Sequence, residues 1–343
     1  SGILPFLRAG WREDQASSTS KLEKRLDKHL SELKAQLDRL SAELTDRMRQ
    51  LDSADRIGTV DRDVRMLRET LALNIAHRTQ KADRAAGLEP GRVGAHVRQA
   101  VDQARLETDP SAHILINGLL PDDTYQAVLD GIPPRVFFSQ KDNAKQNLKL
   151  AQIDVAPDWT IDTLAFIEQA LIPRMMVPAL LKKFEPLIRE FYVREYGAAR
   201  GPGLAAIPHE ATGGRLMLRR PGYHLDPHLD PKRVVFTCLI YFARPGDSEA
   251  YGTGFYRMNG TPTIDRTSTF YPGSQGITCD LVKMVPFRPN TAVAFLNWGA
   301  AHGADIPKTA PRDTERYAYQ FYVSPEATAL AALVGETEAA VVE

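Results

Sequence analysis

The sequence predicts an α+β protein in which a helical N-terminal region precedes a sheet domain built as a sandwich or barrel. Two observations carry this prediction. Heptad-spaced leucines and a long apolar stretch indicate helices along most of the chain up to about residue 196. From about residue 214 onward, short runs of β-branched and aromatic residues alternate with Gly and Pro turns, which is typical of all-β sandwiches and barrels.

Composition excludes several classes of protein. The 43 basic residues balance the 43 acidic ones, so no overall field would attract nucleic acid or an anionic membrane. No uninterrupted apolar run reaches the roughly 18 residues of a membrane-spanning helix. The two cysteines, Cys238 and Cys279, lie in strand-like segments without paired spacing, so we expect no disulfide and a reducing, cytoplasmic location.

The first helical region spans residues 21–51, where apolar residues recur at spacings of four and three. After a break at Gly58 and Thr59, a second stretch follows over about 60–86. The pattern predicts either a parallel coiled coil between subunits or an antiparallel hairpin within one chain, and we favour a homo-oligomer. The two heptad core positions are filled by Leu26, Leu30, Leu33, Leu37, Leu40, Leu44, Arg47 and Leu51.

The chain therefore divides into an N-terminal tail over 1–20, a helical arm over 21–108, a sheet domain over 109–326 and a C-terminal tail over 327–343. Gly- and Pro-rich residues 87–94 punctuate the arm before a third helix over 95–107. The sheet domain begins with a strand at 113–117, a capped helix at 121–130 and a helical segment at 161–196, continuous or broken at a proline.

The predicted strands then follow in close order, separated by turns. Two long loops, 244–254 and 259–276, are rich in Gly, Pro, Ser and Thr and are candidates for lids or specificity elements. The strands are expected at 215–219, 234–242, 254–258, 277–285, 291–298 and 317–323.

A His-x-Asp pair, His228 and Asp230, stands between two prolines and just before a strand-like run. In an extended chain residues i and i+2 project to one face, so this imidazole and this carboxylate can hold one metal ion. His302, just after the apolar run 291–298, offers a third ligand. Two histidines and a carboxylate with open positions opposite form the ligand set of a non-heme Fe(II) oxygenase.

Two alternatives bear on this assignment. His224 and Asp226 form a second His-x-Asp pair, but a strand follows His228 directly, so His228 is preferred. Downstream, Arg316 opens the last predicted strand and could clamp a carboxylate in bidentate fashion. Its rival, Arg312, falls in the loop 308–314, where a solvated role is expected.

The segments PGYHLDPHLDPKRVVFTCLIYF, TAVAFLNWGAAHG and RYAYQFYV together resemble the Fe(II)- and 2-oxoglutarate-dependent dioxygenases, in particular the prolyl-hydroxylase-like branch. The resemblance implies a double-stranded β-helix, or jelly roll, in which His228, Asp230 and His302 bind Fe(II). It also implies that Arg316 pairs with the distal carboxylate of 2-oxoglutarate. Such an enzyme uses O2, hydroxylates an unactivated C–H bond and releases succinate and CO2.

Further residues are candidates for this site. Tyr241 and Thr237 could hydrogen-bond the keto acid, although strand tyrosines are usually packing residues. Residues that could face the substrate are His224, Arg219, Asn297 and Trp298. The substrate does not follow from the sequence: a glycan or peptide is our hypothesis, a small metabolite the alternative, and desaturation or cyclisation stay open beside hydroxylation.

Two other classes of function compete. One is a coiled-coil assembly protein whose sheet domain is a non-catalytic binding module, which the metal triad together with Arg316 disfavours. The other is a cupin-like metal enzyme that uses no keto acid, in which Arg316 should be dispensable.

Overall fold

The structure is a computed structural model that describes residues 31, 34–35, 38–39, 42, 54–77, 81–139, 141–149, 151, 155–261 and 267–334. The chain forms two units, Ser1–Gln80 with Val155–Trp159, and Lys81–Asp154 with Thr160–Glu343. The heptad residues on which the coiled-coil prediction rests lie outside the described residues, as do the tail 1–20 and the last part of the C-terminal tail.

In the first unit, α2 (Ala54–His77) is one helix that continues through Gly58, where we expected a break. The Arg68 guanidinium lies 2.9 Å from the carboxylate of Asp38, and Asn74 exchanges two hydrogen bonds with Asp158. The Arg68–Asp38 ion pair is a contact within one chain between residues of the two predicted stretches. Association between chains stays a prediction.

The helices of the second unit include two that we assigned to the arm, α3 and α4. The third helix begins at Pro90 rather than at residue 95, because Glu89 caps it by accepting hydrogen bonds from the amides of Gly91 and Arg92. The helices that lie wholly in this unit are α3 (Lys81–Gly87), α4 (Pro90–Gln103), α5 (Asp122–Asp130), α7 (Val177–Tyr196), α8 (Gly201–Ala206) and α9 (Ala327–Val334). A further helix, α6 (Asp158–Phe166), begins with two residues of the first unit.

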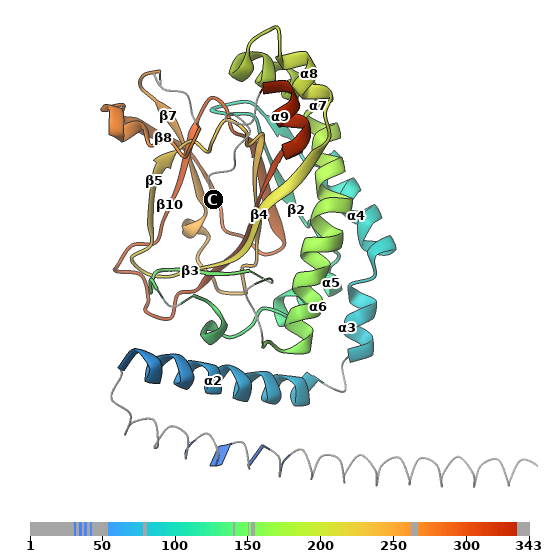
Figure 1. Cartoon of the computed structure of the whole chain (residues 1–343), viewed down its shortest axis with the longest axis vertical. Coiled ribbons are helices and arrows are strands. Elements are labelled where there is room, and N and C mark those ends of the chain that lie inside the picture. Colours follow the sequence, from blue (N-terminus) through green and yellow to red (C-terminus); the bar gives the residue numbers. More distant parts are fainter. Residues whose placement is uncertain are drawn as a thin grey trace, which may run out of the picture. The chain divides into compact units, whose positions relative to one another are not determined.

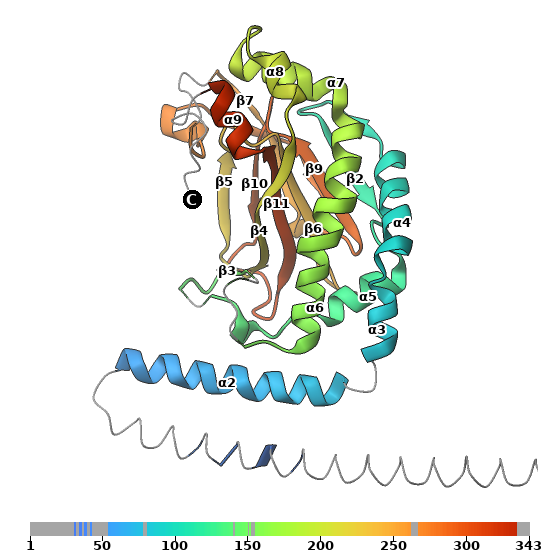
Figure 2. The same cartoon turned by 45° about the vertical axis from the view of Figure 1, so that its right-hand side comes forward.

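The helical segment predicted at 161–196 is continuous, since a π-helical stretch, Ile167–Met176, joins α6 to α7 around Pro173. By length and composition Asp158–Tyr196 could cross a membrane, yet 56% of its most apolar window is buried in the protein. The ring of Phe184 in α7 packs against the ring of Phe236 in the sheet in an edge-to-face arrangement, with the ring centroids 4.8 Å apart. The segment is therefore packed as the core helix of a globular domain (Figures 1 and 2).

Eleven described strands form two antiparallel sheets, which Figure 1 shows as separate layers. The larger sheet has the order β1 (Leu106–Glu107), β2 (His113–Asn117), β9 (Thr291–Leu296), β6 (Phe236–Tyr241), β11 (Arg316–Pro325), β4 (His209–Arg219) and β3 (Lys145–Leu148). The smaller has the order β5 (His224–His228), β10 (Ala301–Asp305), β7 (Thr253–Met258) and β8 (Cys279–Val285).

One face of the larger sheet carries the helices and the other faces the smaller sheet. On β11, the Tyr319 hydroxyl donates to Glu168 of the helical run at 2.7 Å, whereas Ala318 belongs to an apolar core that includes Phe255 of the smaller sheet. Alternate residues of β11 therefore point to the helices or into the space between the sheets. That core consists of Met217, Leu239, Tyr241, Ala243, Phe255, Val285, Phe287, Val293, Phe295 and Ala318.

The six predicted strands after residue 214 all exist, with ends shifted by a few residues. Four strands were not predicted. The short strand β1 falls at the end of the segment predicted as the third helix, 95–107. The others, β3, β5 and β10, have the sequences KQNL, HLDPH and AHGAD, which lack the β-branched and aromatic residues that mark strands. Both cysteines are free, as expected. The mixture of helices with antiparallel sheets confirms the α+β class.

Candidate metal centre

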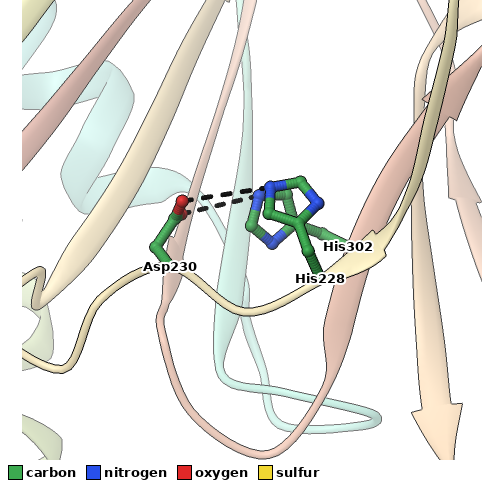
Figure 3. Close-up of side chains that lie close together, drawn as sticks. All are labelled: His228, Asp230 and His302. Carbon is green, nitrogen blue, oxygen red and sulfur yellow. Dashed lines mark ion pairs between the residues drawn. The ribbon is translucent and has the colours of Figure 1, made fainter. Parts of the chain in front are cut away.

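His228 and His302 meet because β5 and β10 are antiparallel neighbours in which these two residues stand directly opposite each other. Side chains of such a pair point to the same face, and the two ring centroids are 4.1 Å apart. Asp230 follows β5 in an extended segment, so its carboxylate faces both rings (Figure 3). We expected His302 to lie beyond a strand, whereas it lies within β10.

The backbone around each histidine fixes the orientation of its ring. The Nδ1–H of His228 donates to the Asp226 carbonyl at 2.9 Å, which leaves Nε2 as the free nitrogen. After His302 the β5–β10 register shifts, and Gly303 occupies the irregularity. A Cβ at Gly303 would lie 2.7 Å from the carbonyl oxygen of Leu225, so this irregularity requires glycine.

The His302 ring is enclosed by apolar side chains, since the ring of Phe295 packs edge to face against it at 4.7 Å. Burial, and next the neighbouring His228, lower the pKa of His302 to about 3, against the opposing effect of Asp230. His302 is therefore neutral near pH 7, which is the form that binds a metal ion through its lone pair.

The three side chains offer ligand atoms that all lie within 4.8 Å of one another. The Asp230 carboxylate is 3.9 Å from Nε2 of His228 and 3.5 Å from Nε2 of His302. Atoms that share an ion at about 2.1 Å each lie roughly 3–4 Å apart, so the arrangement fits one metal ion. Because Thr237 donates a hydrogen bond to Oδ2 of Asp230, Thr237 orients the carboxylate.

Asn297, which we expected to face a substrate, instead fastens the segment that carries Asp230. Its side-chain carbonyl accepts from the Asp230 amide at 3.1 Å, and its NH2 group donates to the carbonyls of Asp230, Pro231 and Val234 at 2.9–3.1 Å. The side chain is buried, so these bonds are not exchanged for water. Asn297 is a positioning residue for the metal ligand.

Replacing Asn297 with alanine should lower the free energy of unfolding by about 3 kcal/mol, because buried amide and carbonyl groups of the Asp230 segment lose their partners. It should also weaken metal binding roughly 10- to 100-fold, as loss of a ligand's supporting contact does. Urea unfolding and metal titration measure both effects. Asn259→Ala is the matched control, since the Asn259 side chain bonds to exposed Thr278 and Asp280. Equal losses in both variants would contradict the positioning role.

Two further candidates lie in other surroundings. His224 is exposed, and its two ring nitrogens contact the carboxylates of Asp305 and Asp226 at 2.9 Å each, which raise its pKa. Trp298 is partly buried, and the Arg194 guanidinium of α7 stacks over its ring at 5.0 Å. The structure does not bring either residue into the group of three ligands.

Arg316 is buried in the space between the sheets, with 3% of its surface exposed. Its guanidinium donates to the carbonyls of Tyr251 and Gly252 and lies 5.3 Å from the ring centroids of both Tyr241 and Phe287. No carboxylate of the described residues lies within ion-pair distance. A buried charge of this kind is costly unless an anion joins it.

Arg219 stands opposite Arg316 on the neighbouring strand β4 and is equally buried, at 2% exposure. Its donors reach the carbonyls of Gln146 and Leu218 and the side chain of Asn147, while Nε has no partner. Burial lowers the pKa of Arg219. Arg219, predicted as a substrate residue, thus extends a buried cationic locus with Arg316, whereas Arg312 is exposed.

Residues that the sequence analysis missed also flank the centre. The ring of Tyr271, from the loop 259–276, lies 5.6 Å from that of His228, and Phe270 beside it pairs with Leu229. The predicted loop therefore reaches the metal ligands, although residues 262–266 lie outside the described part of the chain. No motif marks Tyr271, because only the folded loop brings it there.

No protein-family model matches the sequence, and no curated protein does. Similar solved structures include an oxidoreductase of the 2OG-Fe(II) oxygenase family from Burkholderia pseudomallei, 10% identical over 62% of this chain and 84% of that one, with a TM-score of 0.36. A prolyl-4-hydroxylase from Pseudomonas putida is 15% identical over 67% and 99%, with a TM-score of 0.35. HygX from Streptomyces hygroscopicus, with nickel, 2-oxoglutarate and hygromycin B bound, is 12% identical over 64% and 84%, with a TM-score of 0.33. These values are low, and the function is inferred from the residues of this chain.

Proposed function

We propose that this protein is an Fe(II)- and 2-oxoglutarate-dependent oxygenase of the double-stranded β-helix type, which hydroxylates a C–H bond and releases succinate and CO2. The observation that carries the proposal is the pairing of two features in one inter-sheet space. One is a buried group of two histidines and a carboxylate, and the other is a buried arginine without an acidic partner among the described residues.

Each residue then has a role that its contacts support. His228, Asp230 and His302 would hold the Fe(II), which supplies activation of O2 when it is bound. Thr237 and Asn297 fix the direction of the Asp230 carboxylate. Arg316 would bind the distal carboxylate of 2-oxoglutarate, and Arg219 beside it adds a second positive charge.

Tyr241 contacts the Arg316 guanidinium that would bind the keto acid. Its ring lies under the Arg316 guanidinium, and its hydroxyl shares a hydrogen bond of 2.7 Å with Thr253. Tyr241 is therefore placed to fix Arg316 by a cation–π contact, which strengthens when water is excluded. The apolar walls keep water from the guanidinium, so a bound carboxylate would meet little competition.

The test is the visible spectrum of the anaerobic protein titrated with Fe(II) and then with 2-oxoglutarate. We expect a weak metal-to-ligand charge-transfer band that saturates with the keto acid, because chelation by the keto acid creates that transition. Succinate formation under O2 checks turnover. Iron-loaded protein that shows no band would leave a non-catalytic binding module as the better account, and a cupin-like enzyme would turn over without the keto acid.

A further inference from the structure

A third arginine, Arg215, lies on the same face of β4 as Arg219 but at the other end of the inter-sheet space. In the pairing of β4 with β11, Arg215 stands opposite Gln320, Met217 stands opposite Ala318, and Arg219 stands opposite Arg316. Met217 and Ala318 belong to the core between the sheets. Because side chains two residues apart share a face, Arg215 and Gln320 face that space too.

The end at which Arg215 lies is the end that holds the metal ligands. Tyr322 of β11 stands opposite Thr237 of β6, and Thr237 bonds to the Asp230 carboxylate. Burial raises the pKa of Tyr322 most and Asp230 raises it further, while Arg215 and Arg233 oppose the rise. Tyr322 therefore lies between Thr237, which bonds to Asp230, and Arg215, which donates to the Tyr322 hydroxyl.

An irregularity in the sheet shapes this end. The β4–β11 register shifts between Gln320 and Tyr322, where Gly213 adopts a positive φ of 66°. A Cβ at Gly213 would lie 2.7 Å from the Tyr322 ring, so glycine is required for the ring to lie against β4. The shift lets the Arg215 guanidinium reach two acceptors of β11 at once.

The Arg215 guanidinium is ordered by neutral groups only. It donates to Gln320 Oε1 at 2.5 Å and to the Tyr322 hydroxyl at 3.5 Å, and it lies 5.8 Å from the Tyr322 ring centroid. Its other acceptor is the Gly213 carbonyl at 3.4 Å. No carboxylate of the described residues pairs with it. A guanidinium has five donors in a rigid fork, so capacity for an oxyanion is left.

Exposure separates Arg215 from the other two arginines. Arg215, Gln320 and Tyr322 are all partly exposed, whereas Arg316 and Arg219 are buried. The balance of charge also favours an anion beside Arg215. A divalent metal ion, a dianionic keto acid, the Asp230 carboxylate, Arg316 and Arg219 together carry one net positive charge. Arg215 adds a second, which no group of the proposed cofactor set neutralises.

We propose that Arg215, Gln320 and Tyr322 form an anion-binding subsite beside the metal ligands, which binds a carboxylate of the primary substrate. The inference rests on the proposed function, and it narrows the substrate to an anionic molecule whose reacting carbon lies a short distance from that carboxylate. The keto acid's own metal-side carboxylate is the other source of the same chemistry. An experiment with both ligands distinguishes them.

The experiment uses the full chain loaded with Mn(II) and saturating 2-oxoglutarate, with acetate as the probe. Paramagnetic relaxation of the acetate methyl protons reports acetate bound near the metal, and neutral acetamide is the matched probe. We expect saturable relaxation with acetate and none with acetamide. Arg215→Gln should weaken acetate binding at least tenfold, and Arg215→Lys should recover part of it because the charge is kept.

Arg257→Gln is the charge-matched control, since Arg257 is an exposed residue of β7 paired with Asp109. It should bind acetate as the wild type does, and circular dichroism checks that each variant folds. No saturable acetate effect in the wild type, or an unchanged effect in folded Arg215→Gln, would overturn the subsite.

Titration with 2-oxoglutarate shows whether Arg215 binds a substrate carboxylate or the metal-side carboxylate of the keto acid. If Arg215→Gln weakens 2-oxoglutarate tenfold or more and acetate binds only without it, Arg215 belongs to the keto acid and the substrate assignment is wrong. If the wild type binds Mn(II) and acetate at Arg215 but never 2-oxoglutarate, the anion site stands and the proposed oxygenase function fails.

Discussion

His228→Ala should abolish specific Fe(II) binding, whereas His224→Ala should leave it unchanged, although both residues belong to His-x-Asp pairs. His228 supplies one of three ligand atoms that converge on one point, and its ring is oriented by the Asp226 carbonyl. Loss of a direct ligand costs more than the roughly 10- to 100-fold of losing a supporting contact. His224 is exposed, its two ring nitrogens already contact the carboxylates of Asp305 and Asp226, and it is not part of the group of three ligands.

Isothermal titration with Fe(II) under anaerobic conditions, checked with Mn(II), measures both variants against the wild type. His228→Ala should keep its fold, because the ring lies at the end of β5 and makes no apolar core contact comparable with that of His302. Equal binding by His228→Ala and the wild type would exclude this triad. Loss of binding in His224→Ala alone would move the metal to the upstream pair.

The sequence singled out the three side chains that the structure groups as possible metal ligands, but it could not show why they meet. The His-x-Asp spacing is local, so the parity of an extended chain suffices to bring His228 and Asp230 to one face. His302 joins them only through the register of β5 with β10. These two strands could not be predicted from the sequence, because they lack the β-branched and aromatic residues typical of strands. The order of motifs therefore predicted the ligand set, and non-local strand pairing supplied the geometry.

The same limit explains the residues that were misplaced. Asn297 and Trp298 follow the same strand and looked equivalent in sequence, yet Asn297 fastens the Asp230 segment while Trp298 lies under Arg194 of α7. Arg219 lies near the metal motif in the chain, but the direction of β4 carries its side chain to Arg316, and Arg215 lies at the metal end instead. Strand direction cannot be inferred from spacing alone, so the sequence could not show which end of the strand lies near the metal ligands.

Arg316→Met should weaken 2-oxoglutarate binding at least about thirtyfold, since losing one partner of a buried, hydrogen-bonded charge pair costs roughly 2–5 kcal/mol. Arg312→Met is the control and should bind 2-oxoglutarate normally, because Arg312 is exposed in its loop. The charge-transfer titration measures both dissociation constants. A larger loss in Arg312→Met than in Arg316→Met would reverse the assignment.

The stability of the same variant provides an independent readout, because the buried Arg316 charge opposes folding when no anion is bound. Two backbone carbonyls lose a donor in Arg316→Met, but the desolvated charge and its cost vanish with it. The metal-free variant should therefore unfold at a denaturant concentration close to that of the wild type. With iron present in both proteins, 2-oxoglutarate at 100 times the wild-type dissociation constant should add about 2.7 kcal/mol to the free energy of unfolding of the wild type and far less to that of the variant. A variant that unfolds much earlier than the wild type, yet still gains that increment, would make Arg316 a structural residue instead.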